Sequence, residues 1–332
     1  MHILIATHQA LSIRSEVDKI RRVAENDGHI VTVIRKENLT PDFLVKNSFD
    51  GILWVSNTER IPDFLSKHRV VYYLTTEGHT FGYKPSKDWF VVANSNFTKR
   101  MLEESGFSVD TVVYHGFDIL RFSRVRDTIV HKTRMRGFNR CFMVNKVWTQ
   151  RNGFELIQKT LIEFYRRYGR RLFIKDFGSI PFGYGLPKDV ANGNFIVSYW
   201  VMKPLPDDVI FEGYRTSDVY IHQSASEGFG LTLLEALGCG VPSIYVNGEP
   251  MTELVYSGYG YRIPVSDVKY VKFEGYPDFD FYTNVYELDD AVEAWYHAYE
   301  GDNDSVNGEY INRFNMYDLY GRLINLVGEV CS

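Results

Sequence analysis

The amino-acid sequence predicts an α/β protein with two doubly wound domains, each a parallel sheet covered by helices on both faces. Three observations carry this prediction. Short apolar strand-like runs alternate with helical segments, and the series occurs twice along the chain. The 332 residues are enough for two domains that each bury a core. The content of 45% hydrophobic and 24% charged residues is typical of a globular protein and excludes a disordered chain.

The first series lies in residues 1–122 and is predicted to form the N-terminal domain. Its strands are short, apolar and rich in β-branched residues. Helical segments at 12–26 and 96–105 lie between them. The expected strands are 2–7, 29–35, 51–55, 70–75, 89–93 and 109–114.

The second series lies in residues 141–315 and is predicted to form a C-terminal domain that faces the first across a cleft. Apolar residues recur at helical spacing in 154–168 and 288–299, and again in a final helix within 316–332. The expected strands are 141–145, 172–177, 195–199, 219–223, 242–246 and 261–264.

Residues 123–140 separate the two series and are predicted to be a basic linker. Arginine and lysine recur there with little apolar periodicity, and a solvated surface is the simplest interpretation. Such a stretch could also attract an anionic substrate or make a peripheral contact with an anionic membrane. The net charge of −5 argues against nucleic acid as a partner.

The cysteine pattern and the hydropathy favour a cytoplasmic protein. Cys141, Cys239 and Cys331 have no paired spacing, so neither a disulfide framework nor a cysteine zinc site is expected. No apolar run approaches the length of a membrane span, and the chain begins with a predicted strand rather than a signal peptide.

The most informative segment is residues 224–242, SASEGFGLTLLEALGCGVP. It follows a predicted strand and leads into a helix, at the sheet edge where α/β proteins bind ligands. Glycines let a ligand approach the backbone closely, and the N–H groups at a helix start suit a phosphate. The residues predicted to surround this phosphate are Gly228, Phe229, Gly230, Leu231 and Thr232.

Two carboxylates frame this segment. Glu227 precedes the helix and Glu235 lies within it, so they are on the order of 10 Å apart. This separation suits two hydroxyl-bearing rings on either side of a phosphate. Alternatively, Ser224 and Glu227 form a structural capping box. That register places Gly228 and Gly230 inside the helix, at a cost of about 1 kcal/mol each.

The segment resembles the E-x7-E signature of the GT-B glycosyltransferases, specifically the retaining family 4 (group 1) type. Segments similar to those of the family occur, in order, at 91–100, at 112–118 with Phe122, and at 253–260, so the resemblance covers about residues 90–265. It implies two Rossmann-like domains facing a cleft, with the final helix crossing back to the first domain.

The resemblance also implies a reaction. A sugar would move from a nucleotide-diphosphate sugar to a hydroxyl acceptor with retention of configuration, without a metal or other cofactor. Glu235 would hold the ribose hydroxyls and Glu227 the sugar hydroxyls. The acceptor would attack the front face of the sugar, and the departing phosphate would take its proton.

Two basic residues complete the implied donor site. Relatives hold the diphosphate with an arginine and a lysine about five residues apart. Lys146 takes the arginine position here and Arg151 the lysine position, while Asn145 replaces the usual glycine. Both charges are kept, but the hydrogen-bond geometry changes. The alternative is a pair of solvated surface charges beside a helix start.

The first domain contributes two further candidates in residues 74–80. Related enzymes often place a histidine there against the transferred sugar, and Glu77 or His79 could serve, with Glu77 considered first. The alternative for His79 is an exposed loop histidine.

Three other functions compete with this interpretation. Asp278 and Asp280 fit the D-x-D motif of metal-dependent transferases, but two carboxylates in a predicted surface loop are a weak metal site. A nicotinamide dehydrogenase would need a G-x-G-x-x-G turn directly after a strand. None of the predicted strands is followed by this motif. A non-catalytic nucleotide-sugar-binding protein agrees with the same motifs.

Overall fold

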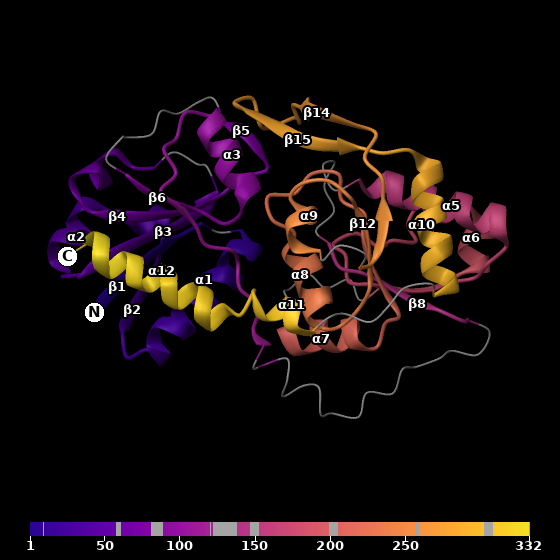
Figure 1. Ribbon diagram of the computed structural model, residues 1–332, viewed down its shortest axis with the longest axis horizontal. Helices are drawn as coiled ribbons and strands as arrows, with labels where there is room; N and C mark the ends of the chain where they lie inside the picture. Colours follow the sequence, from indigo (N-terminus) through magenta and orange to yellow (C-terminus); the bar gives the residue numbers. More distant parts are fainter. Residues whose placement is uncertain are drawn as a thin grey trace. The chain divides into compact units, whose positions relative to one another are not determined.

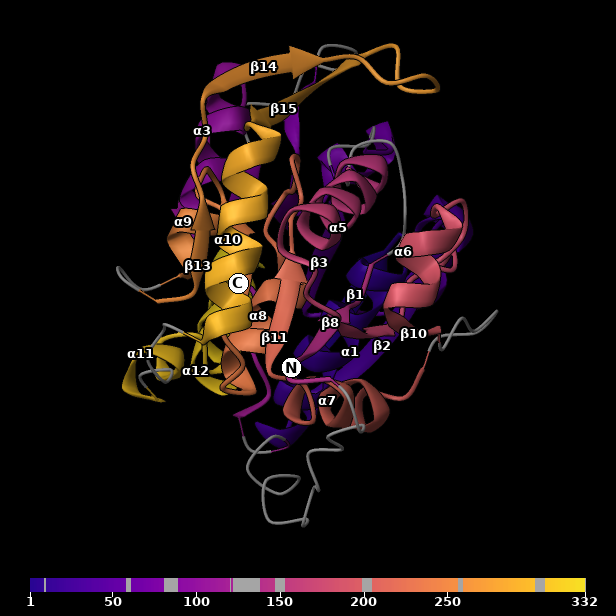
Figure 2. The same cartoon turned by 90° about the vertical axis from the view of Figure 1, so that its right-hand side faces the viewer.

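A computed structural model describes residues 1–8, 10–57, 61–80, 89–119, 121, 138–146, 153–198, 205–255, 259–301 and 308–331. The chain divides into two compact units (Figures 1 and 2). Unit 1 comprises Met1–Asp118, Glu274–Phe281 and Arg313–Ser332, and unit 2 comprises Ile119–Phe273 and Tyr282–Asn312. Residues 123–137 of the predicted basic linker, and Phe122 before it, lie outside the described residues.

Unit 1 contains a six-stranded sheet with parallel pairing and the order β2-β1-β3-β4-β6-β7. The strands are β1 (His2–Thr7), β2 (Ile30–Arg35), β3 (Gly51–Asn57), β4 (Val70–Thr75), β6 (Phe90–Ala93) and β7 (Thr111–Val112). The helices are α1 (Leu11–Asn26), α2 (Pro41–Lys46), α3 (Asn96–Glu104) and α12 (Met316–Cys331), with 3₁₀ turns η1 (Lys36–Asn38) and η2 (Asp63–Lys67). Every strand expected in residues 1–122 overlaps one of these strands.

Successive side chains of a strand point to opposite faces of the sheet, and in the central strands both sets are buried. Helices therefore cover both faces of this sheet. Ile3 and Ile5 of β1 pack in one cluster with α1 and α12, while Leu4 and Ala6 pack in another with Leu102 of α3. Figure 1 shows α12 beside α1, although the two helices lie at opposite ends of the sequence. The final helix is thus part of the core of unit 1.

Two glycines allow α12 to approach the rest of unit 1 closely. A Cβ on Gly51 would lie 2.5 Å from Cγ1 of Val327, and one on Gly116 would lie 2.4 Å from the Cα of Met316. Because such distances are far below van der Waals contact, neither position has space for a side chain.

Unit 2 contains a second six-stranded parallel sheet with the order β10-β9-β8-β11-β12-β13. Its strands are β8 (Cys141–Val144), β9 (Phe173–Asp176), β10 (Phe195–Ser198), β11 (Val219–His222), β12 (Ser243–Val246) and β13 (Tyr261–Ile263). Its helices are α5 (Phe154–Tyr168), α6 (Lys188–Gly193), α7 (Asp207–Arg215), α8 (Leu231–Gly238), α9 (Met251–Leu254), α10 (Leu288–Glu300) and α11 (Gly308–Asn312).

Aromatic side chains fix which helices cover which face of this sheet. Phe142 of β8 packs against Trp295 of α10, which also packs against Phe164 of α5. Figure 2 shows α5 and α10 side by side. Tyr220 of β11 packs edge-to-face against Tyr214 of α7. Helix α7 therefore covers the face of β11 that carries Tyr220.

A third sheet has the order β14-β15-β5, from β14 (Asp267–Val271), β15 (Phe279–Val285) and β5 (Gly78–Thr80). Within unit 1, β15 pairs antiparallel with β5, and Asp280 lies opposite His79. The sequence predicted a surface loop at Asp278 and Asp280. This is wrong for Asp280, which lies in a strand, while Asp278 lies in an exposed turn.

No helix in the described part of the chain is long and apolar enough to cross a membrane.

Candidate functional site

The loop from β11 to α8 forms the centre of the candidate site in unit 2. Helix α8 begins at Leu231, after Gly230 with φ of 95°. Glu227 precedes the helix and Glu235 lies within it, as the sequence predicts. The alternative capping box is wrong, because the helix begins well after Ser224, whose hydroxyl donates to the carbonyl of Ser226 at 3.4 Å.

The start of α8 supplies backbone groups that can receive an anion. The first N–H groups of a helix have no carbonyl acceptor within the helix, and the helix dipole is positive there. Gly228, Phe229 and Gly230 are buried, while Leu231 and Thr232 are half-buried. The structure therefore places the predicted phosphate-binding residues where the backbone of α8 starts.

Gly230 and Gly240 offer a matched test of this loop. Both have positive φ, 95° and 74°, but only a Cβ on Gly230 would meet a neighbour, Cδ1 of Leu254 at 3.2 Å. We expect Gly240→Ala to lower the free energy of unfolding by about 1 kcal/mol through backbone strain alone. Gly230→Ala should cost about 2 kcal/mol, since contact strain adds to it. Equal losses in urea denaturation would contradict this explanation.

Lys146 and Glu227 come together from distant parts of the chain. Lys146 follows β8 and is only 6% exposed. Its Nζ lies 3.5 Å from Oε1 of Glu227, whose side chain is 19% exposed. The alternative that Lys146 is a solvated surface charge is therefore wrong. Arg151, the second predicted cation, lies outside the described residues.

A buried tyrosine from α7 supports Glu235. The hydroxyl of Tyr214 lies 3.4 Å from Oε2 of Glu235 and 3.2 Å from the carbonyl oxygen of Thr232. The amide of Asn145 donates to this hydroxyl at 3.1 Å. Burial, together with the neighbouring Tyr220 and Glu235, raises the pKa of Tyr214 well above 10, so it stays a neutral donor. Asn145 thus helps to fix the carboxylate of Glu235 through Tyr214.

His222 is a further residue of this site that the sequence analysis missed. It is the last residue of β11 and has no exposed surface. Its Nδ1 lies 3.3 Å from the hydroxyl of Thr232, and its Nε2 lies 3.9 Å from Oε1 of Glu227. Burial, and then the Lys146 charge, lower its pKa to about 3 although Glu227 raises it, so the ring is neutral. The sequence signal that could have identified His222 is its position at the end of the strand that precedes the motif.

The first-domain candidates lie just beyond the end of β4. Glu77 is half-buried. His79 lies in β5, and its Nε2 is 2.5 Å from Oε2 of Glu104 in α3, with a side chain 17% exposed. The alternative of an exposed loop histidine is therefore wrong. A sugar contact by Glu77 or His79 stays a prediction.

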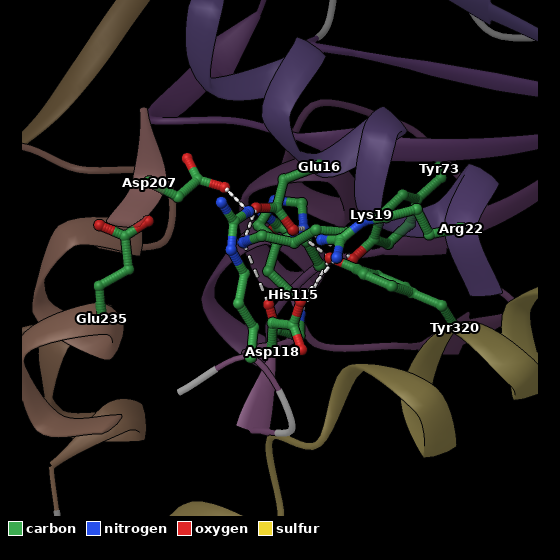
Figure 3. Close-up of polar contacts among 12 residues, drawn as sticks. Glu16, Lys19, Arg22, Tyr73, His115, Asp118, Asp207, Glu235 and Tyr320 are labelled. Carbon is green, nitrogen blue, oxygen red and sulfur yellow. Dashed lines mark hydrogen bonds and ion pairs between the residues drawn. The ribbon is translucent and has the colours of Figure 1, made fainter. Parts of the chain in front are cut away.

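The sequence analysis also missed a buried polar cluster in unit 1. Figure 3 shows Glu16 and Lys19 of α1 converging with His115, Tyr73 and Tyr320 of α12. Nζ of Lys19 lies 2.6 Å from Oε1 of Glu16, and the hydroxyl of Tyr320 donates to the same carboxylate. The cluster fastens α12 to α1. The sequence signal for this cluster was that Glu16 and Lys19 lie on the apolar face of α1, together with Ile13, Val17 and Ile20.

Within this cluster, His115 is neutral and accepts or donates hydrogen bonds on both nitrogens. Its Nδ1 lies 2.9 Å from the hydroxyl of Tyr73, and its Nε2 lies 2.9 Å from the amide nitrogen of Asn94. Burial lowers the pKa of His115 to about 4 against the opposing charge of Glu16.

The described residues contain no group of three or more His, Cys, Asp or Glu side chains that could hold a metal ion.

One family of known proteins matches the part of the chain that contains this loop. The family described as glycosyl transferases group 1 matches residues 201–272, which include Glu227 and Glu235. No curated protein matches the chain.

Solved glycosyltransferases share the fold over nearly the whole chain. WaaG, a glycosyltransferase of lipopolysaccharide biosynthesis, has a TM-score of 0.64 at 12% identity, covering 98% of this chain and 99% of that one. The lipopolysaccharide outer core galactosyltransferase WaaB has a TM-score of 0.61 at 14% identity, covering 98% and 99%. The sucrose-phosphate synthase of Thermosynechococcus elongatus has a TM-score of 0.63 at 11% identity, covering 98% of each chain.

A longer relative is the pneumococcal O-GlcNAc transferase GtfA in complex with UDP and GlcNAc, with a TM-score of 0.51 at 15% identity. The match covers 84% of this chain but only 56% of that one. Together the comparisons confirm the predicted GT-B fold and the resemblance to group 1 glycosyltransferases.

Proposed function

We propose that the protein is a glycosyltransferase that moves a sugar from a nucleotide-diphosphate sugar to a hydroxyl acceptor. The observation that carries this proposal is the buried Lys146 ammonium beside Glu227, at the sheet edge where α8 begins. A cation, helix N–H groups and two flanking carboxylates form an arrangement suited to a diphosphate between two polyols. The family match lies over the same loop.

The proposed chemistry breaks the bond between C1 of the sugar and the diphosphate oxygen. Negative charge builds up on that oxygen in the transition state. Lys146 and the backbone N–H groups from Gly228 to Thr232 would stabilise this charge, without a metal, because they are already oriented. In this proposal Arg151 adds a second positive charge. The departing phosphate takes the proton of the acceptor hydroxyl as the new bond to C1 forms on the same face.

The two carboxylates have separate roles in this proposal. Glu227, paired with Lys146, orients the sugar through its hydroxyls rather than attacking C1. Glu235, held by Tyr214, accepts hydrogen bonds from the vicinal ribose hydroxyls. Such charge-assisted bonds stabilise two carboxylates near a diphosphate that would otherwise repel them.

A nucleotide-sugar panel tests the proposal. Thermal unfolding is measured with UDP-glucose, UDP-galactose, UDP-N-acetylglucosamine, GDP-mannose and ADP-glucose, each with EDTA and with Mg²⁺ or Mn²⁺. At 100 times its Kd, a true donor should stabilise the fold by about 2.7 kcal/mol with EDTA present. Stabilisation that needs the metal would refute metal independence.

Product analysis then separates an enzyme from a binding protein. Incubation of the stabilising donor with sugar and lipid acceptors should release the nucleoside diphosphate, and NMR should show the donor's anomeric configuration in the product. Tight binding without any transfer or hydrolysis would favour the non-catalytic alternative.

Glu235 provides a direct test of donor binding. We expect Glu235→Gln to raise the donor Kd about 10- to 100-fold, since a neutral amide loses the charge-assisted bonds to the ribose. The matched control is Glu212→Gln on the exposed surface of α7, which should leave the Kd unchanged. Isothermal titration measures both. Unchanged binding and turnover by Glu235→Gln would refute the assigned role.

A further inference from the structure

His222 lies directly beneath the loop that carries Glu227. The residue is completely buried at the end of β11, between Thr232 of α8 on one side and Glu227 on the other. A Cβ on Gly230 would lie 3.5 Å from its Nε2, so the ring also touches the turn before α8. The imidazole therefore contacts three parts of the proposed donor site without reaching solvent.

One nitrogen of this ring has no hydrogen-bond partner among the residues that the structure describes. Within the described part of the chain, Nε2 of His222 is a buried polar atom without an acceptor or donor at bonding distance. Its nearest charged oxygen is Oε1 of Glu227 at 3.9 Å. Because buried polar groups are normally paired, an orphan nitrogen aimed at a site residue indicates a bond that forms in another state.

The surroundings of His222 decide which nitrogen carries the proton. The titratable groups that face the ring are Lys146, Glu227 and Tyr220. The ring is neutral and has one N–H. A proton on Nδ1 would leave the lone pair of Nε2 facing a carboxylate, which is repulsive. A proton on Nε2 faces Glu227 favourably, while the hydroxyl of Thr232 donates to Nδ1.

Lys146 gives a reason for a second donor to Glu227. Its ammonium pairs with Oε1 of Glu227, the same oxygen atom that Nε2 of His222 faces. A bound diphosphate carries more negative charge than one carboxylate and draws the ammonium toward itself. Glu227 then needs another donor to keep its orientation toward the sugar.

We infer that His222 is a positioning residue, whose Nε2–H takes over the Glu227 carboxylate when Lys146 turns to the diphosphate. The inference rests on the proposed function, in which Glu227 binds sugar hydroxyls. The bond needs a shift of about 1 Å from the 3.9 Å separation to reach ordinary hydrogen-bond length.

Two substitutions of His222 separate a donor from a packing role. His222→Gln keeps a neutral N–H near the position of Nε2, whereas His222→Leu keeps bulk but has no donor. Binding is measured with UDP-glucose and with UDP, or with the corresponding pair for whichever panel nucleotide stabilises the wild type most. Melting temperature, kcat and KM are recorded for each variant.

We expect His222→Leu to weaken UDP-glucose binding about 10- to 100-fold and UDP binding less than about threefold, because only the sugar contact depends on Glu227. His222→Gln should restore the part of the UDP-glucose affinity that depends on the sugar. A structural role would lower the melting temperature and both affinities in parallel, and it would overturn the inference.

The remaining outcomes are also decisive. An unchanged ratio of UDP-glucose to UDP affinity in His222→Leu refutes the role of His222 alone. Failure of the wild type to bind any panel nucleotide refutes the proposed function, and this inference with it. If His222→Leu does not fold, Thr232→Val tests the same point by removing the hydroxyl that fixes the tautomer, and an unchanged ratio there overturns the inference.

Discussion

Replacing Lys146 with methionine is expected to lower kcat about 10²- to 10³-fold while the protein stays folded. Methionine preserves much of the buried side-chain volume but has no charge for the leaving diphosphate. Removing a single oriented donor at a developing oxyanion costs about 3–4 kcal/mol of transition-state stabilisation. Steady-state kinetics with saturating donor measure the loss, and circular dichroism shows that the fold is retained.

Lys146→Arg is the matched control for this prediction. Arginine is the residue that the family resemblance implies at this position, and it keeps the charge with a planar set of donors. We expect kcat within about tenfold of the wild type. If arginine were as damaging as methionine, the positive charge would not account for the loss, and the role of Lys146 in stabilising the diphosphate would be wrong.

Lys19→Met is expected to have the largest effect on stability, lowering the free energy of unfolding by about 3–5 kcal/mol. Lys19 and Glu16 are both buried, so removal of the ammonium leaves a buried carboxylate without its paired cation. Burial by itself raises the pKa of Glu16, but the Lys19 ammonium, together with the hydrogen bonds from Lys19 and Tyr320, outweighs it and lowers the pKa below its ordinary value. Urea denaturation followed by circular dichroism measures the loss.

A double variant separates the unpaired charge from lost packing. Glu16→Gln in the Lys19→Met background removes the charge but keeps an oxygen that accepts from Tyr320, so most of the stability should return. Arg21→Met, which removes an exposed pair with Glu25 on the same helix, should cost less than about 1 kcal/mol. A loss in the double variant as large as in Lys19→Met would show that packing accounts for the effect.

The fold was largely predictable because the burial pattern of each strand is local. Every expected strand overlaps a strand of the structure, and β1 and β4 have the predicted bounds. The short helices α2, α6 and α9 were not predicted, since one or two turns carry too little periodicity. The strands β5, β14 and β15 were also missed, because β14 is mostly exposed and the pairing of β15 with β5 joins residues far apart in sequence.

The candidate site was predictable only where a motif is contiguous. The loop and helix start from Gly228 to Thr232, with Glu227 and Glu235 on either side, could be placed because one strand–loop–helix unit contains them all. Tyr214 and Asn145 could not be connected to Glu235, since no spacing along the chain relates α7, β8 and α8. His222 adjoins the motif in sequence, but its burial and its direction toward Glu227 depend on the packing of α8 on β11.

The sequence by itself determined the fold class, the two series of strands and helices, and the chemistry offered by the loop before α8. These follow from hydrophobic periodicity and from residues that are neighbours along the chain. Only the tertiary structure decided which charges meet. Lys146 and Glu227 are separated by 81 residues and Glu16 and Tyr320 by 304, and their contacts depend on strand order and helix packing. Burial then decided which of these groups are charged and which, like His222, are neutral donors.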